Sequence, residues 1–154
     1  MAASAWQLYS KAKRYLGNGT IQLGVNNFKM ALFRAASNTS TFTLSTFGSL
    51  TNEISATGGY VSGGKALVPA TGTWALTSAN STVVKFTYST VGLTFTASGA
   101  PLTNVKYAVI FQSAATLANG KLLCFCQLSS SQFTVSSPNT LTVLPAATGV
   151  FTLT

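Results

Sequence analysis

From Gly19 to the end of the chain, apolar residues alternate with small polar residues in short runs. This period of two is typical of strands that bury one face, because successive side chains point to opposite sides of a sheet. Turn-forming residues separate the runs, and Asn119-Gly120 between two apolar runs predicts a hairpin. We therefore predict strands at residues 20–23, 28–34, 65–68, 73–77, 82–88, 91–96, 104–111, 121–128, 132–135, 140–144 and 150–154. Many short strands in one chain of 154 residues favour an all-β fold: a single β-sandwich domain over residues 1–154, jelly-roll-like.

The N-terminal segment breaks this alternation and predicts the one long α-helix, at about residues 4–16. Ser4 is placed to be its N-cap, with Gln7 three residues later as in a capping box. Gly17-Asn18-Gly19 is a typical helix stop signal. The aromatic stripe of this helix must dock either on its own domain or on a partner subunit, with the basic residues facing outward.

A second, short helix is expected near residues 43–53. Apolar residues recur there at intervals of three and four, which favours a helix over a strand.

Charge is the unusual part of the composition. Nine cations face one acid, Glu53, so the net charge is +8, and charged residues make up 6% of the chain against about 25% in an ordinary domain. A surface built from uncharged polar residues favours association. The dispersed positive charge attracts something acidic, which could be nucleic acid, an anionic protein shell or a cell surface. For Glu53 we predict a local role as an ion-pair or capping partner; the alternative is an intersubunit salt bridge.

The residue types available restrict the possible chemistry. The chain has no His and no Asp, so paired carboxylates, a Ser-His-Asp triad and the usual metal sites lack their members. Cys124 and Cys126 would lie on one face of a strand about 7 Å apart, too far for a disulfide, and we interpret them as buried core thiols. We expect no enzyme activity, no catalytic residue, no cofactor and no metal.

The chain shows no sign of a membrane or export role. No run approaches the roughly 20 apolar residues of a helical span. The N-terminus lacks the order of charged and apolar residues that a signal peptide has. We expect the protein to be made and used without export.

Three hypotheses for function remain open at this point. Depleted charge, Thr/Ser-rich strands and the aromatic helix favour a structural protein of a large assembly. The +8 charge and the SKAKRY cluster favour nucleic-acid binding, although the other cations are scattered and not interleaved with aromatic residues. A carbohydrate-binding or adhesive module is the third, weakened by the lack of acids and by having only two Trp residues.

The order of segments resembles small structural proteins of tailed bacteriophages. The resemblance spans nearly the whole chain and is carried by SAWQLYSKAKRYLGNGTIQL, FKMALF, LTNEISATGGYVSGGKAL, NVKYAVIF with GKLLCFCQLSSSQFTVSSPNTLTV, and GVFTLT. The chain departs from the family pattern at residues 22–27, where relatives usually carry acidic residues. Family members with an assigned role resemble capsid cement, or decoration, proteins with jelly-roll-like sandwiches.

The resemblance implies a capsid cement protein on the outside of the icosahedral head, made in the host bacterial cytoplasm. Its partners would be the major capsid protein and itself, as a homodimer or homotrimer, rather than nucleic acid or membrane. The alternative within the virion is a protein associated with the tail, neck or fibre. From the helix and the strands we select the partner-contact residues Trp6, Tyr9, Lys13, Arg14, Tyr15 and Arg34.

Overall fold

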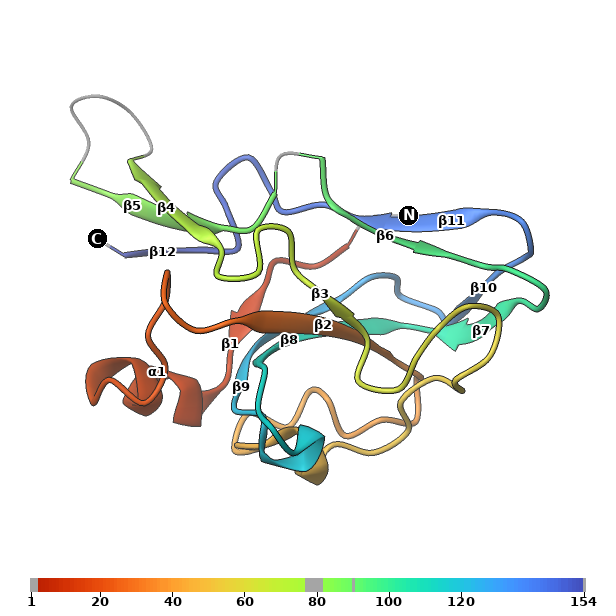
Figure 1. Cartoon of the computed structure of the whole chain (residues 1–154), viewed down its shortest axis with the longest axis horizontal. Coiled ribbons are helices and arrows are strands. Elements are labelled where there is room, and N and C mark those ends of the chain that lie inside the picture. Colours follow the sequence, from red (N-terminus) through yellow and green to blue (C-terminus); the bar gives the residue numbers. More distant parts are fainter. Residues whose placement is uncertain (1–2, 77–81, 90, 154) are drawn as a thin grey trace.

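The computed structural model describes residues 3–76, 82–89 and 91–153, and it is an all-β, sandwich-like structure with one α-helix. Figure 1 shows two layers of strands, with the helix at one end of the lower layer. The elements in chain order are β1 (Gln7–Leu8), α1 (Ser10–Gly17), β2 (Phe28–Phe33), the 3-10 turn η1 (Phe47–Ser49), β3 (Lys65–Ala66), β4 (Thr73–Leu76), β5 (Val84–Thr87), β6 (Leu93–Thr96), β7 (Leu102–Val105), β8 (Tyr107–Gln112), the 3-10 turn η2 (Leu117–Asn119), β9 (Leu122–Gln127), β10 (Phe133–Val135), β11 (Thr140–Val143) and β12 (Phe151–Leu153).

The lower layer is an antiparallel sheet in the order β1-β9-β8-β2-β3, and β7 and β10 pair beyond the ends of β8 and β9. Its three central strands have almost continuous buried runs, from FKMALF, YAVIFQ and LLCFCQ. Strands this apolar need cover on both faces. The upper layer covers one face, and the loop through η1 packs from the other, with the Phe47 ring centroid 4.4 Å from that of Phe111.

The upper layer consists of β12-β5-β4 and of β11 paired with β6. β11 pairs antiparallel with β6, and β12 pairs antiparallel with β5. Residues 140–153 therefore run along one edge of this layer. Rings from both layers meet between them: Phe28 of β2 lies edge-on to Phe86 of β5 at 6.1 Å between centroids.

The predicted strands are confirmed in their main positions, with two corrections. Residues 20–23 form a turn after the helix rather than a strand, although Ile21 is buried. The predicted strand at 104–111 is two strands, because Asn104 has a positive φ of 61° and the Lys106 N–H donates to Phe33 O at 2.8 Å. Residue 77 of the predicted strand 73–77 and residue 154 of the predicted strand 150–154 lie outside the described residues.

The hairpin β8–β9 is confirmed as an antiparallel pair, but Asn119-Gly120 does not form a tight two-residue turn. The connection passes through η2, and Gly120 has φ −54°. The turn is longer because Leu117 and its neighbours pack back toward η1, where Gly48 approaches Ala118.

The prediction of a helix at residues 4–16 is wrong in its first half. Residues 3–9 are extended and pair with β9, and α1 begins only at Ser10. Ser4 does not cap a helix: its N–H donates to Gln127 O at 2.8 Å, and its hydroxyl accepts from the Gln127 N–H at 2.9 Å. Pairing with the free edge of β9 satisfies backbone groups that a first helical turn would leave open.

The expected helix near residues 43–53 is reduced to the single 3-10 turn η1. The chain on either side is extended, because Thr46 forms a bridge with Lys121 and Glu53 forms one with Phe33. The helical spacing of the apolar residues reflects Phe47 and Ile54 entering the core from an irregular loop.

Candidate interaction surface

Glu53, the only acid of the chain, is fully engaged by nearby donors. Tyr60 donates its hydroxyl to Oε1 at 2.6 Å, the Gly63 N–H donates to the same oxygen at 2.7 Å, and Ser62 donates to Oε2 at 2.9 Å. The Tyr60 oxygen in turn accepts from the Leu32 N–H at 3.0 Å. The carboxylate therefore ties the 60–64 loop to the end of β2, which is a local structural role.

The surroundings of Tyr60 keep it a donor. Burial, followed by the neighbouring Glu53 carboxylate, raises the pKa of Tyr60 far above its ordinary value. The loop also approaches β2 closely: Gly64 has φ +68°, and a Cβ there would lie 1.9 Å from Met30 O. Gly64 of the GGK pair thus serves this junction, whereas Gly58 of GGY approaches Ala100, where a Cβ would lie 2.3 Å from the carbonyl oxygen.

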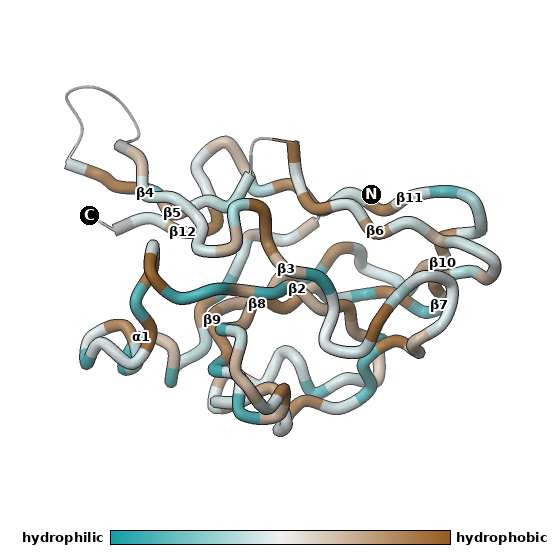
Figure 2. Tube along the Cα trace, viewed as in Figure 1, coloured by the Kyte–Doolittle hydropathy of each residue, from teal (hydrophilic) through white to brown (hydrophobic). Residues whose placement is uncertain are grey.

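The exposed face of α1 is cationic. Ala12 is buried against the core, so the opposite side of the helix presents Lys11, Lys13 and Arg14 to solvent. Figure 2 shows α1 with hydrophilic segments at the end of the lower layer. Tyr15 is half-buried at the edge of this face, and Lys121 Nζ lies 5.8 Å from its ring centroid. We call Lys11, Lys13, Arg14 and Lys121, with Tyr15 among them, the cationic surface.

These cations have no counter-charge in the described part of the chain. Glu53 is occupied by Tyr60, Ser62 and Gly63, and no ion pair forms within residues 3–76, 82–89 and 91–153. Several other cations are held by neutral groups: Lys65 donates to Thr94 O at 3.1 Å, Lys85 to Ala147 O at 3.0 Å, and Arg34 to the Ser55 hydroxyl. The cationic surface is where unpaired positive charge gathers most densely along one element.

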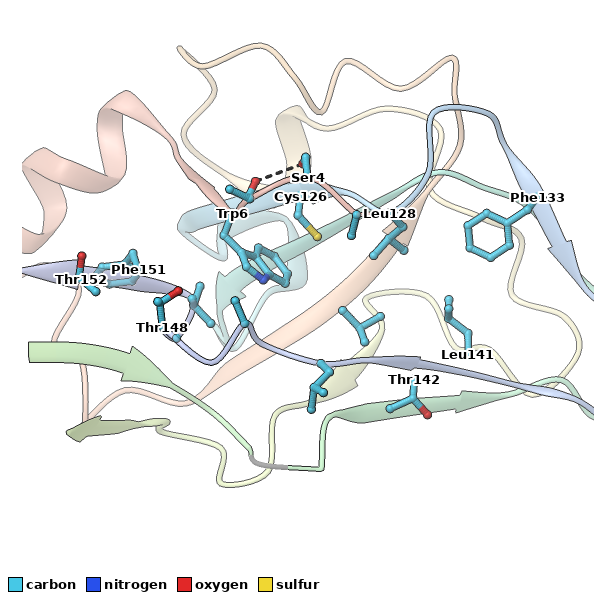
Figure 3. Close-up of a pocket in the computed structure, with 17 residues that line it drawn as sticks. Ser4, Trp6, Cys126, Leu128, Phe133, Leu141, Thr142, Thr148, Phe151 and Thr152 are labelled. Carbon is cyan, nitrogen blue, oxygen red and sulfur yellow. Dashed lines mark hydrogen bonds between the residues drawn. The ribbon is translucent and has the colours of Figure 1, made fainter. Parts of the chain in front are cut away.

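The structure separates the six predicted contact residues. Lys13, Arg14 and Tyr15 lie together on α1. Arg34 follows β2 and lies beside Ser55, in a different part of the molecule. Trp6 precedes β1 and points into a groove described below (Figure 3).

The prediction that Tyr9 contacts a partner is not supported by its position, because Tyr9 is buried in the core. It is 0% exposed, its hydroxyl donates to Thr39 O at 2.9 Å, and its ring lies 5.1 Å from that of Phe125. Tyr9 entered the prediction as part of a helical aromatic stripe. Because it is the residue between β1 and α1, it anchors both to the core instead.

Sequence reasoning missed two members of the cationic surface. Lys11 belongs to the SKAKRY cluster but was not selected as a contact residue, although its position beside Lys13 and Arg14 was a usable signal. Lys121 lies more than a hundred residues away in sequence, just before β9. Only the packing of α1 against β9 brings it to Tyr15, and no local pattern announces that.

An apolar groove of about 660 Å³ lies between the edges of the two layers. Residues 3–6 border it on the side of β1, and residues of β11, β12 and their connection border it on the other. Figure 3 shows the Trp6 indole in its centre, with Cys126 and Leu128 beside it.

The two thiols are buried core residues, as predicted. Both cysteines are free, and they project from β9 to the same face. Burial raises the pKa of the Cys126 thiol to about 12, which keeps it protonated.

No group of three or more His, Cys, Asp or Glu side chains gathers in the described residues. Within the same residues, no helix has the length and apolar character needed to cross a membrane.

Comparison of the chain with protein-family models, with curated proteins and with solved structures finds no match.

Proposed function

We propose that this chain is a structural virion protein of a tailed phage, a capsid cement protein that binds the outside of the head through its cationic surface. The observation that carries the proposal is the unneutralised charge: nine cations, with the one carboxylate consumed inside the fold. Positive charge without an internal partner is suited to an acidic external one.

The kind of surface favours a protein partner over nucleic acid. Three of the four cations are lysines, which act as point charges and lack the planar fork that Arg offers to phosphate. Tyr15, the aromatic residue of the surface, lies under Lys121 and is half-buried, so it offers little open face for stacking a base. A carboxylate-rich protein shell needs neither feature.

The sandwich-like fold agrees with the resemblance to phage structural proteins. A head packed with DNA strains its shell from within, and a clamp across capsomer boundaries adds contacts at the seams. Each copy contributes modestly, but many identical copies sum. A small all-β domain with little exposed charge apart from one cationic surface suits this task.

The location of the protein on the particle tests the proposal directly. We expect immunogold labelling or cryo-EM of intact virions to place the chain on the exterior of the head. Finding it only on the tail, neck or fibre would contradict the cement role and assign it there.

Two variants that remove the same amount of charge from different places test the surface. In Lys13→Gln/Arg14→Gln, binding to heads that lack the protein should weaken about tenfold, since each of the two lost contacts with an acidic partner is worth up to about 1 kcal/mol. Lys65→Gln/Lys85→Gln is the matched control, because it removes the same charge from the upper layer and β3; its binding should change little. Equal losses in both variants would leave only a general effect of net charge and overturn the assignment to α1.

Tighter binding to duplex DNA than to heads would favour the nucleic-acid hypothesis instead.

A further inference from the structure

The apolar groove is an open seam of the sandwich. On one side, residues 3–6 continue β1 along the edge of the lower layer. On the other, residues 140–153 run along the edge of the upper layer, and no further strand pairs with them in the described part of the chain. Between the two edges the interior of the sandwich is reached from outside, with Trp6, Phe133, Leu141 and Phe151 only half-buried.

The lining of this seam contains no charged residue. All seventeen lining residues are apolar or small and uncharged, and neither residues 3–8 nor residues 140–153 contain a Lys, Arg or Glu. Two cations contact residues at the groove without lining it: Lys85 Nζ donates to Ala147 O, and the Lys106 carbonyl accepts from the Leu128 N–H. Every one of the nine cations is thus kept off this face.

The seam carries no charge to protect its free edge. Proteins blunt an edge strand with an inward charge or a lysine, with a proline or a bulge, or by keeping the strand short, and of these the seam has only short strands and Pro145 after Leu144. Here the edge is Thr140-Leu141-Thr142-Val143, followed by Leu144 with 56% of its surface exposed. The Trp6 indole lies in the seam, and Figure 3 draws no hydrogen bond from it to the other residues that line the groove. A half-buried Trp is typical of a protein interface.

We propose that this seam is the surface through which the chain binds a second copy of itself. The argument for that occupant is electrostatic. Two copies that each carry +8 repel wherever cationic faces meet, so they approach most closely through faces without charge, and the seam is such a face that also offers an apolar groove. An acidic partner would gain nothing from the seam and is drawn to the cationic surface instead. The two surfaces therefore have different occupants.

Salt separates this self-association from binding to an acidic partner. Raising the ionic strength screens repulsion between like charges, and apolar burial is not weakened by it. We expect light scattering on the isolated protein to give a mass that is a multiple of 16.0 kDa and association that strengthens with salt. A wild-type chain that stays at 16.0 kDa at all concentrations and salts overturns the proposal.

Substitutions locate the interface. Leu144→Lys places a cation in the seam, where like charges would be buried together, so association should weaken at least about tenfold. Thr148→Lys does the same from the exposed loop and serves if the first variant folds poorly by circular dichroism. Val25→Lys is the matched control: Val25 is 67% exposed and does not line the groove. Association that is unchanged in both folded seam variants overturns the proposal, as does equal weakening in Val25→Lys.

Trp6 reports on the seam directly. In Trp74→Phe, Trp6 is the one remaining Trp. Its emission should shift to the blue and resist quenching as concentration rises in step with the mass. An apolar dye that shifts this emission while the mass stays at 16.0 kDa would assign the groove to a small molecule and overturn the proposal. These measurements use the isolated protein, so their outcome is independent of whether it binds a phage head.

Discussion

Glu53 holds together the junction of the 60–64 loop and β2. Its two oxygens accept from Tyr60, Ser62 and the Gly63 N–H, and Tyr60 is buried beside the half-buried carboxylate. Glu53→Gln keeps one oxygen as an acceptor but loses the charge that strengthens these bonds, so the free energy of unfolding should fall by about 1–2 kcal/mol. Chemical denaturation measures this.

A double-mutant cycle checks that the loss arises at this contact. Glu53→Ala leaves the Tyr60 hydroxyl without its acceptor and should cost more than Glu53→Gln. Tyr60→Phe removes the stranded donor, so the two changes together should cost less than their sum. Additive effects would contradict the structural role. Unchanged fold stability with altered oligomer mass would point to the intersubunit salt bridge.

The buried thiols make stability depend on alkaline pH. Burial raises the pKa of Cys126 from its ordinary value of 9.0 to about 12, so the folded state holds a proton that the unfolded chain releases. This contribution is complete below about pH 9 and is lost as pH rises toward 12, at about 1.4 kcal/mol per pH unit. Cys126→Ala should therefore show a shallower fall in unfolding free energy over that window than wild type. Parallel curves would show that the thiol does not contribute. Tyr88 and Cys124 also titrate in this range, and Cys126 helps to raise the pKa of each, so the difference between the two curves includes that coupling.

At the scale of elements, the segment before α1 shows where a local pattern loses to tertiary pairing. The capping-box spacing at Ser4 and Gln7 is real, yet Ser4 hydrogen-bonds Gln127 across the sheet and Gln7 pairs with Phe125. Similarly, nothing local marks the break between β7 and β8, because Lys106 is turned by a bond to Phe33 on another strand. The strands themselves were predictable, since a period of two needs only neighbouring residues.

Paired serine substitutions test the extended segment. Ser4→Ala removes the acceptor of the Gln127 N–H and should cost about 0.5–1.5 kcal/mol, with faster hydrogen exchange at the Gln127 amide. Ser10→Ala is the control, because Ser10 starts α1, is exposed, and makes no side-chain cap; it should be neutral or slightly stabilising. Unchanged exchange at Gln127 in Ser4→Ala would argue against pairing of residues 3–9 with β9.

For the molecule as a whole, the same contrast applies to the candidate surfaces. The cluster of Lys11, Lys13 and Arg14 is visible in the sequence because its members are neighbours. The seam is not visible in the sequence. Trp6, Phe133 and Leu144 line one groove only because the fold places residues 3–6 on the lower layer opposite residues 140–153 on the upper layer. A charge-free N-terminus and a charge-free C-terminus were both readable, but their adjacency is a property of the fold.

The two layers share one hydrophobic core, which predicts one cooperative unfolding transition. Its buried residues belong to both layers, and Phe28 and Phe86 meet across them. Because the buried residues in the described part of the chain form one cluster, neither layer should unfold and leave the other intact. Calorimetry should give one peak with an enthalpy of about 100 kcal/mol near 60 °C, equal to the van't Hoff value. Leu144→Lys is the suitable protein for this measurement, because dissociation of copies would otherwise mix with unfolding. Two separable transitions would instead divide residues 1–154 into two domains, and the layer that melts first would identify the weaker one.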